Sequence, residues 1–291
     1  MENKYHVRSN SFPSQSHPSS TRIEQDLNKI KTWEATSTST SHSITNGLSM
    51  LEDLYISLED LLNMTSTQKA ISHNQGEKFV EELMDGSMKI LDVCGITRDT
   101  MLQIKENVQS LHSSLRRRKG DSNIKTSVVE YNLFTKKMKK NVAKLIKSLK
   151  QMESKFGASS ILNQDQEVVG VIRVLREVIV MNMSIFQSIL SFLVGSASNS
   201  KATKWFKVTK LMHNRVVSPC EVNLENFNEL NYVKASLSTL LREGSNVAKM
   251  QVAHERLETL ENAIEMIESG LENLFRRLVK TRVCLLNIIT L

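Results

Sequence analysis

Seven aliphatic residues near the C-terminal end of the chain recur at alternating steps of three and four positions. They are Leu257, Leu260, Ile264, Ile267, Leu271, Leu274 and Leu278. Because an α-helix completes a turn about every 3.6 residues, this spacing places all seven on one stripe of a single long helix. The segment is therefore predicted to pack against other helices. Gly270 lies within the stripe and predicts close approach of a neighbouring helix at that level.

Similar helical periodicity extends over most of the chain. Apolar residues recur at helical spacing in segments 22–33, 77–91, 97–115, 122–156 and 165–194, and again from residue 224 to the end. The sequence Leu51–Leu54 returns seven residues later as Leu58–Leu61, which is typical of a heptad-patterned helix. Cys94 and Gly95 are predicted to separate two of the helices, and Gly244 to break the last region.

Composition supports an all-α protein. Aromatic residues make up only 5% of the 291 residues, glycine occurs 10 times, and no proline lies between Pro18 and Pro219. Because proline interrupts helices and hairpins need glycine-rich turns, this composition favours a multi-helix bundle with long, heptad-patterned helices. The three cysteines are odd in number and far apart, which favours reduced thiols in a cytosolic or nuclear setting, and the cytoplasm is the expected location.

Two regions are predicted along the chain. Residues 1–43 are expected to form a disordered arm rich in Ser and Pro with one short helix, and its residues 36–43 (TSTSTSHS) to act as a linker. Residues 44–291 are expected to form the helical bundle. A chloroplast transit peptide is an alternative interpretation of the Ser-rich head.

The C-terminal stripe has two interpretations. It would serve as a dimerisation seam if complementary charges flanked it, as they normally do in a dimeric coiled coil. Here small and apolar residues, such as Ala263, Gly270 and Phe275, widen the stripe instead. This pattern favours a helix packed within its own chain.

The net charge of +7 is concentrated in one region of the chain. Residues 101–155 contain fourteen Lys or Arg against four acids, and segment 136–155 alone holds eight lysines. The apolar residues of that segment recur every three or four positions, so the lysines fall on the opposite face of one helix. A solvated face is the favoured interpretation, with a membrane surface or calmodulin as alternative partners. Nucleic acid is disfavoured because no recognised binding module accompanies the charge.

Segment 178–195 contains no charged residue and is a marginal candidate for a membrane span. Several polar residues interrupt it, among them Asn182 and Gln187, and Arg176 and Glu177 immediately precede it. We therefore expect a buried helix of the bundle rather than a membrane-spanning one.

The N-terminal arm carries one candidate modification site. Arg8, Ser9, Ser11 and Pro13 match the pattern R-S-x-S-x-P, in which basophilic kinases phosphorylate the second serine. A phosphate there is the kind of ligand that the arginine cluster of 14-3-3 proteins captures. The motif predicts a phosphorylation switch at Ser11.

Catalytic motifs are not apparent. The sequence contains no glycine-rich phosphate loop, no G-x-S-x-G and no HExxH, and no histidine stands at metal-ligand spacing from a cysteine or another histidine. We expect no enzymatic activity, no cofactor, no metal and no small-molecule substrate.

Four segments carry a resemblance to a known family. They are His6–Ser14, Glu82–Asp92, Leu115–Asp121 and Glu265–Leu278. Together they resemble a plant-specific family of uncharacterised helical proteins related to the BYPASS proteins, which are associated with root and shoot development. The resemblance implies a plant protein in developmental signalling and supplies no mechanism. Since catalytic motifs are not apparent, we expect a non-enzymatic regulatory or interaction protein with protein partners that acts in root and shoot development. The alternative is a peripheral membrane protein that uses helix 136–155.

Overall fold

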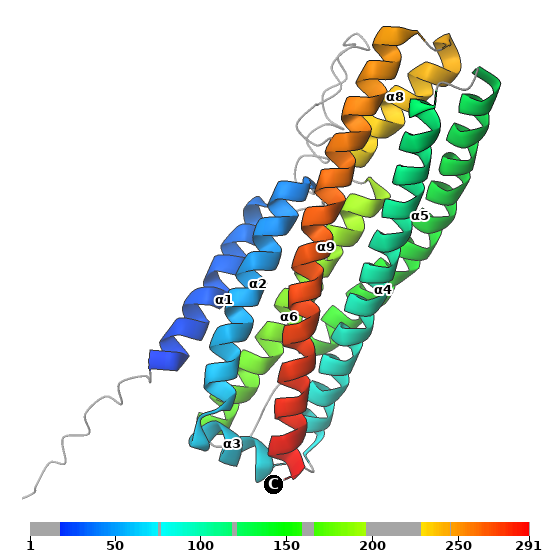
Figure 1. Cartoon of the computed structure of the whole chain (residues 1–291). Helices are drawn as coiled ribbons and strands as arrows, with labels where there is room; N and C mark the ends of the chain where they lie inside the picture. The colour runs from blue at the N-terminus through cyan, green and yellow to red at the C-terminus, as the bar shows by residue number, and fades with distance from the viewer. Residues whose placement is uncertain are drawn as a thin grey trace, which may run out of the picture.

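The computed structural model describes residues 18–74, 77–117, 121–158, 166–195, 228–244 and 246–290, and every regular element in these ranges is an α-helix. The helices are α1 (Pro18–Thr36), α2 (Ser41–Leu62), α3 (Thr65–Ser72), α4 (Lys78–Arg116), α5 (Asp121–Ala158), α6 (Gln166–Val194), α8 (Glu229–Glu243) and α9 (Val247–Thr290). They form an elongated bundle (Figure 1). The prediction of an all-α bundle with long helices is confirmed.

Helix α9 is the longest of the described helices. It runs from the end where α8 lies to the end where α3 lies, and packs mainly against α4, α2 and α8 (Figure 1). All seven residues of the C-terminal stripe are at most 5% exposed. The stripe therefore packs within the chain, as the flanking residues indicated.

The two glycines of the C-terminal region behave as predicted. A methyl group added at Gly270 would lie 3.0 Å from Leu48 Cδ1 of α2, so the two helices approach closely there. Gly244 ends α8 with a φ of +76°, a left-handed conformation that residues with a Cβ rarely adopt. The chain then begins α9 at Val247.

The predicted break at Cys94 and Gly95 is wrong, because α4 passes through both residues without interruption. The Cys94 side chain is fully buried, and its thiol lies 3.9 Å from the Leu271 carbonyl oxygen of α9. A methyl group at Gly95 would meet nothing within 4 Å. The packing of α4 against α9 on both sides of this position therefore outweighs the low helix propensity of one glycine.

The surroundings of two helical glycines predict opposite effects of substitution by alanine. Gly95→Ala should raise the free energy of unfolding by about 0.5–1 kcal/mol, because alanine favours the helix and the site has room. Gly47→Ala in α2 should lower it by about 1–2 kcal/mol, because the new methyl would lie 2.6 Å from the Trp33 ring. That ring cannot move freely, since its Nε1 donates a hydrogen bond to the Ser43 carbonyl oxygen. Urea denaturation followed by circular dichroism measures both, and a loss of stability in Gly95→Ala would contradict the argument.

The bundle begins earlier than the expected boundary at residue 44. Helix α1 is longer than the predicted segment 22–33 and packs against α2 and α6. Its apolar face belongs to the common core through Ile23, Leu27, Ile30 and Trp33. Only residues 37–40 separate α1 from α2 in place of the predicted linker 36–43. The predicted disordered arm before Pro18 lies outside the described residues.

A buried carboxylate also joins α1 to α2. Asp26 accepts hydrogen bonds from Ser57 Oγ at 2.6 Å and from Lys29 Nζ at 2.7 Å. Burial by itself would raise the pKa of Asp26, but the two hydrogen bonds and nearby positive charge outweigh it and hold the pKa below its ordinary value. The charged form of Asp26 therefore fits its site between the two helices.

Helix α6 occupies the interior of the bundle, as predicted for segment 178–195. It contacts α1, α2, α3, α4 and α5, and its Ile185, Phe186, Ile189 and Leu190 are fully buried. Its residues Val169–Val194 are long and apolar enough to cross a membrane, but 61% of the most apolar window is buried among the other helices. Such burial is typical of a helix in the core of a bundle.

Candidate interaction surface on helix α5

Helix α5 lies at the edge of the bundle, where it packs against α4 and α6 (Figure 1). Its inward face contains Val128, Met138, Val142, Leu149 and Met152, all of which are buried. These include residues of the apolar stripe that the sequence predicted. The opposite face of the helix is exposed.

Within segment 136–155 of α5, six lysines are exposed, and within the described part of the chain none of them forms an ion pair. They are Lys136, Lys137, Lys140, Lys144, Lys147 and Lys150. Other lysines of the bundle are neutralised, for example Lys105 by Glu268 at 2.9 Å and Lys31 by Glu177 at 2.9 Å. The outer face of α5 is therefore a surface of uncompensated positive charge, which we call the lysine face.

The neighbouring groups that the structure describes do not neutralise the lysine face. The carboxylate of Glu153 accepts a hydrogen bond from Gln187 of α6 at 3.0 Å, so it is directed toward the bundle. Lys139 lies half-buried at one flank. Burial, and to a smaller degree the positive charge of Lys234 on α8, lowers the pKa of Lys139 below its ordinary value. Both causes disfavour the charged form of Lys139, and neither adds a negative charge beside the lysine face.

Two apolar side chains lie on the same outer face. Val129 is 49% exposed and Leu133 is 63% exposed, the latter more than any other large apolar residue of the described chain except Val247. Neither residue belongs to the face predicted from the sequence. Their place on the lysine face could have been recognised from their spacing, because positions 129, 133, 137, 140, 144 and 147 follow one another at helical steps of three or four.

A groove borders the lysine face between α4 and α5. Its volume is about 520 Å³, and its floor includes Val93 of α4 together with Leu149 and Met152 of α5. Ile96, half exposed, and Lys89 are among the α4 residues that line it. Polar residues, among them Asp92 and Gln151, line the groove as well, so it adds a surface of mixed character beside the charged one.

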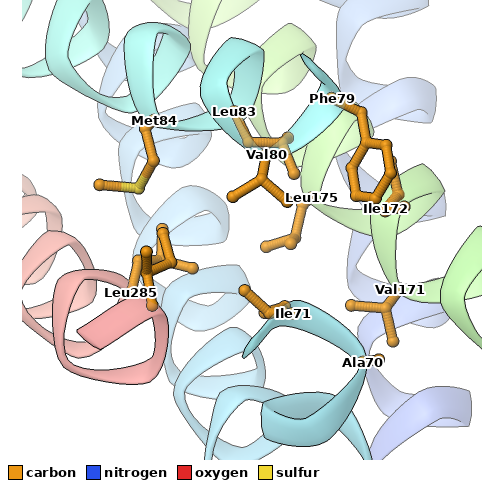
Figure 2. Close-up of a pocket in the computed structure, with 11 residues that line it drawn as sticks. Ala70, Ile71, Phe79, Val80, Leu83, Met84, Val171, Ile172, Leu175 and Leu285 are labelled. Atoms are coloured by element: carbon orange, nitrogen blue, oxygen red, sulfur yellow. The ribbon is translucent and has the colours of Figure 1, made fainter. Parts of the chain in front are cut away.

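The apolar pocket at the end of the bundle near α3 is too small for a ligand. Figure 2 shows side chains of α3, α4, α6 and α9 that point toward one another, among them Ile71, Val80, Leu175 and Leu285. The cavity between them has a volume of about 10 Å³, no more than one water molecule needs, and its lining offers no polar partner. This space is a packing gap rather than a binding site.

Two histidines that are far apart in sequence meet between α4 and α9. The ring centroids of His112 and His254 are 5.3 Å apart, and His112 Nδ1 lies 2.9 Å from Glu261 Oε1. This contact could not be predicted from the sequence, because 142 positions separate the two residues. Among the described residues, no group of three or more His, Cys, Asp or Glu side chains could hold a metal ion.

The predicted phosphorylation motif Arg8, Ser9, Ser11 and Pro13 lies outside the described residues. The structure therefore places none of these side chains relative to the lysine face. The prediction of a switch at Ser11 stays a prediction.

Comparison with known protein families gives a match. The family model described as Protein BPS1 matches residues 47–288. None of the curated proteins matches the chain, and none of the solved structures does. The matched range covers most of the chain and confirms the resemblance to the relatives of the BYPASS proteins. The chain belongs to the family described as Protein BPS1.

Proposed function

We propose that this protein is a non-enzymatic regulator of plant root and shoot development, and that it acts in the cytoplasm by binding other components. Membership of the Protein BPS1 family supports a role in plant development. The observation that carries the mode of action is the lysine face of α5, exposed and without ion pairs in the described part of the chain.

The physical argument rests on how the bundle uses its charges elsewhere. Between helices, cations meet carboxylates: Arg98 pairs with Glu272, Arg176 with Glu82 at 3.2 Å, and Lys280 with Glu59 at 2.6 Å. These pairs join helix surfaces inside the molecule. A row of lysines with no such partner produces a positive potential that attracts anionic groups from outside. The lysine face is therefore the surface through which we expect binding.

A rescue experiment in plants that lack the protein tests this proposal. Lys140→Glu, Lys144→Glu and Lys147→Glu together define the face variant. Lys69→Glu, Lys78→Glu and Arg22→Glu together define the control variant, which makes the same change in net charge at exposed positions on α3, α4 and α1. We expect native protein and the control variant to restore root and shoot growth, and the face variant to fail. Full rescue by the face variant would contradict the proposal.

The arm is proposed as the regulatory element. Phosphate on Ser11 would create the ligand that 14-3-3 arginine clusters bind, so Ser11→Ala should abolish capture of 14-3-3 by protein isolated from plants under phosphatase inhibition. Ser14→Ala, a serine outside the R-S-x-S-x-P pattern, is the matched control. Equal capture by both variants would show that Ser11 is not the switch.

A second function, peripheral attachment to a membrane through helix 136–155, is favoured by the exposed Val129 and Leu133 in line with the lysines. Apolar side chains among lysines on an outer helix face are typical of helices that lie on a membrane surface.

A further inference from the structure

We propose that α5 docks lengthwise on a bilayer that contains anionic phospholipid, with Val129 and Leu133 inserted at the acyl boundary and the lysines on the headgroup phosphates. This inference rests on the proposed function, because it names the partner of the same face. It extends the lipid-binding segment beyond the lysines to two residues that precede them.

The two kinds of side chain form one continuous stripe. Val129 and Leu133 lie one turn apart, and Lys137, Lys140 and Lys144 continue the same line along the helix. From position 129 to position 147 the stripe is about 27 Å long at a rise of 1.5 Å per residue. All of these side chains are exposed. A flat surface laid against this edge of the bundle would meet them together.

The chemistry of the stripe suits a bilayer better than a protein. A protein partner would need a fixed row of carboxylates that matches the lysine spacing and a pocket for Leu133 in the same register. Lipid headgroups move laterally and adjust to any spacing of cations. Lysine side chains are long enough to lie along an apolar surface while the ammonium group remains at the phosphates.

The position of α5 leaves the stripe accessible. Its principal neighbours are α4 and α6, both on the inward side, and no described residue forms an ion pair with the stripe lysines. The one carboxylate of α5 in segment 136–155, that of Glu153, is directed to Gln187 of α6. Anionic headgroups would therefore meet no opposing charge along the stripe between residues 133 and 150.

Vesicle flotation with the purified full chain tests the proposal. Native protein should float with phosphatidylcholine vesicles that contain about one-third phosphatidylserine, and remain unbound with phosphatidylcholine alone. The face variant should bind the anionic vesicles at least ~100-fold more weakly, since each lysine near such a surface contributes a factor of about five. The control variant should stay within about threefold of native binding.

A second substitution tests the insertion of the apolar residues. Leu133→Ser leaves every charge in place and should weaken binding to the anionic vesicles about tenfold, because a side chain that enters the acyl boundary is lost. The loss should persist at high salt, where the contribution of the lysines is screened. Circular dichroism in the absence of lipid should be unchanged, because Leu133 makes little contact within the bundle.

Each result that contradicts the expectation has its own interpretation. The proposal is overturned if native protein ignores anionic vesicles, if the face and control variants lose binding equally, or if Leu133→Ser binds as native protein does. A failure with vesicles combined with loss of plant rescue in the face variant alone would assign the lysine face to an acidic protein instead. Rescue by both variants would reject the proposed function itself, so the two failures are distinguishable.

Discussion

Replacing Ile264 with aspartate should unfold the bundle. Ile264 is 0% exposed at the centre of the α9 stripe, so the substitution removes a fully buried side chain and places a carboxylate in an apolar site. The lost packing and the buried charge together should lower the free energy of unfolding by about 5 kcal/mol or more. This loss equals or exceeds the whole stability of many domains. A dimer seam would instead give folded monomers after the same change.

Circular dichroism and light scattering distinguish these results. Met266→Asp is the matched control, because Met266 lies two residues further along the same helix and is half exposed. The control should keep the helical signal of the native protein and change the free energy of unfolding by less than about 1 kcal/mol. Folded, monomeric Ile264→Asp protein would contradict the packing of the stripe within the chain.

Replacing Glu59 with lysine should lower the free energy of unfolding by about 3–5 kcal/mol. The Glu59 side chain is 14% exposed, and its carboxylate lies 2.6 Å from Lys280 Nζ and 3.3 Å from Arg277 Nη1 of α9. The substitution removes both attractions and sets a third cation against the other two in a partly buried site. Helices α2 and α9 should therefore separate more readily.

The adjacent residue supplies the control. Asp60→Lys makes the same change in net charge, but Asp60 and its partner Arg22 are both exposed and 3.5 Å apart. Its effect should stay below about 1 kcal/mol. Urea denaturation measures both variants, and added salt should recover part of the stability of Glu59→Lys by screening the repulsion. Equal losses in the two variants would show that the position of Glu59 between the helices does not matter.

The predictions that were confirmed depend on the residues of one segment, whereas those that were wrong depend on contacts between segments. The buried stripe of α9 and the two faces of α5 followed from the spacing of apolar residues. The continuity of α4 through Gly95 did not, because the packing of Cys94 against α9 decides it. Helix α1 joins the core for a related reason, since its four apolar residues find α2 and α6 beside them. The Ser- and Thr-rich composition of the neighbouring segment 36–43 contains no information about such a contact.

The candidate surface was predicted in part. Six of the eight lysines of segment 136–155 are exposed as predicted, because charged residues opposite an apolar stripe face solvent in a bundle, whereas Lys139 is half-buried. The exposure of Val129 and Leu133 was missed. An apolar residue is buried only if a neighbouring helix reaches its level, and no helix that the structure describes covers the outer side of α5 at these two positions.

The sequence by itself determined the helical class, most of the helices and the inward face of each long helix, because helical periodicity is a local property of the chain. The tertiary structure alone decided which distant residues meet. Gly270 lies against Leu48, and Glu59 lies against Lys280 across 221 positions. Such pairs depend on the register between helices, which the packing of many side chains sets together, so no single segment contains the information.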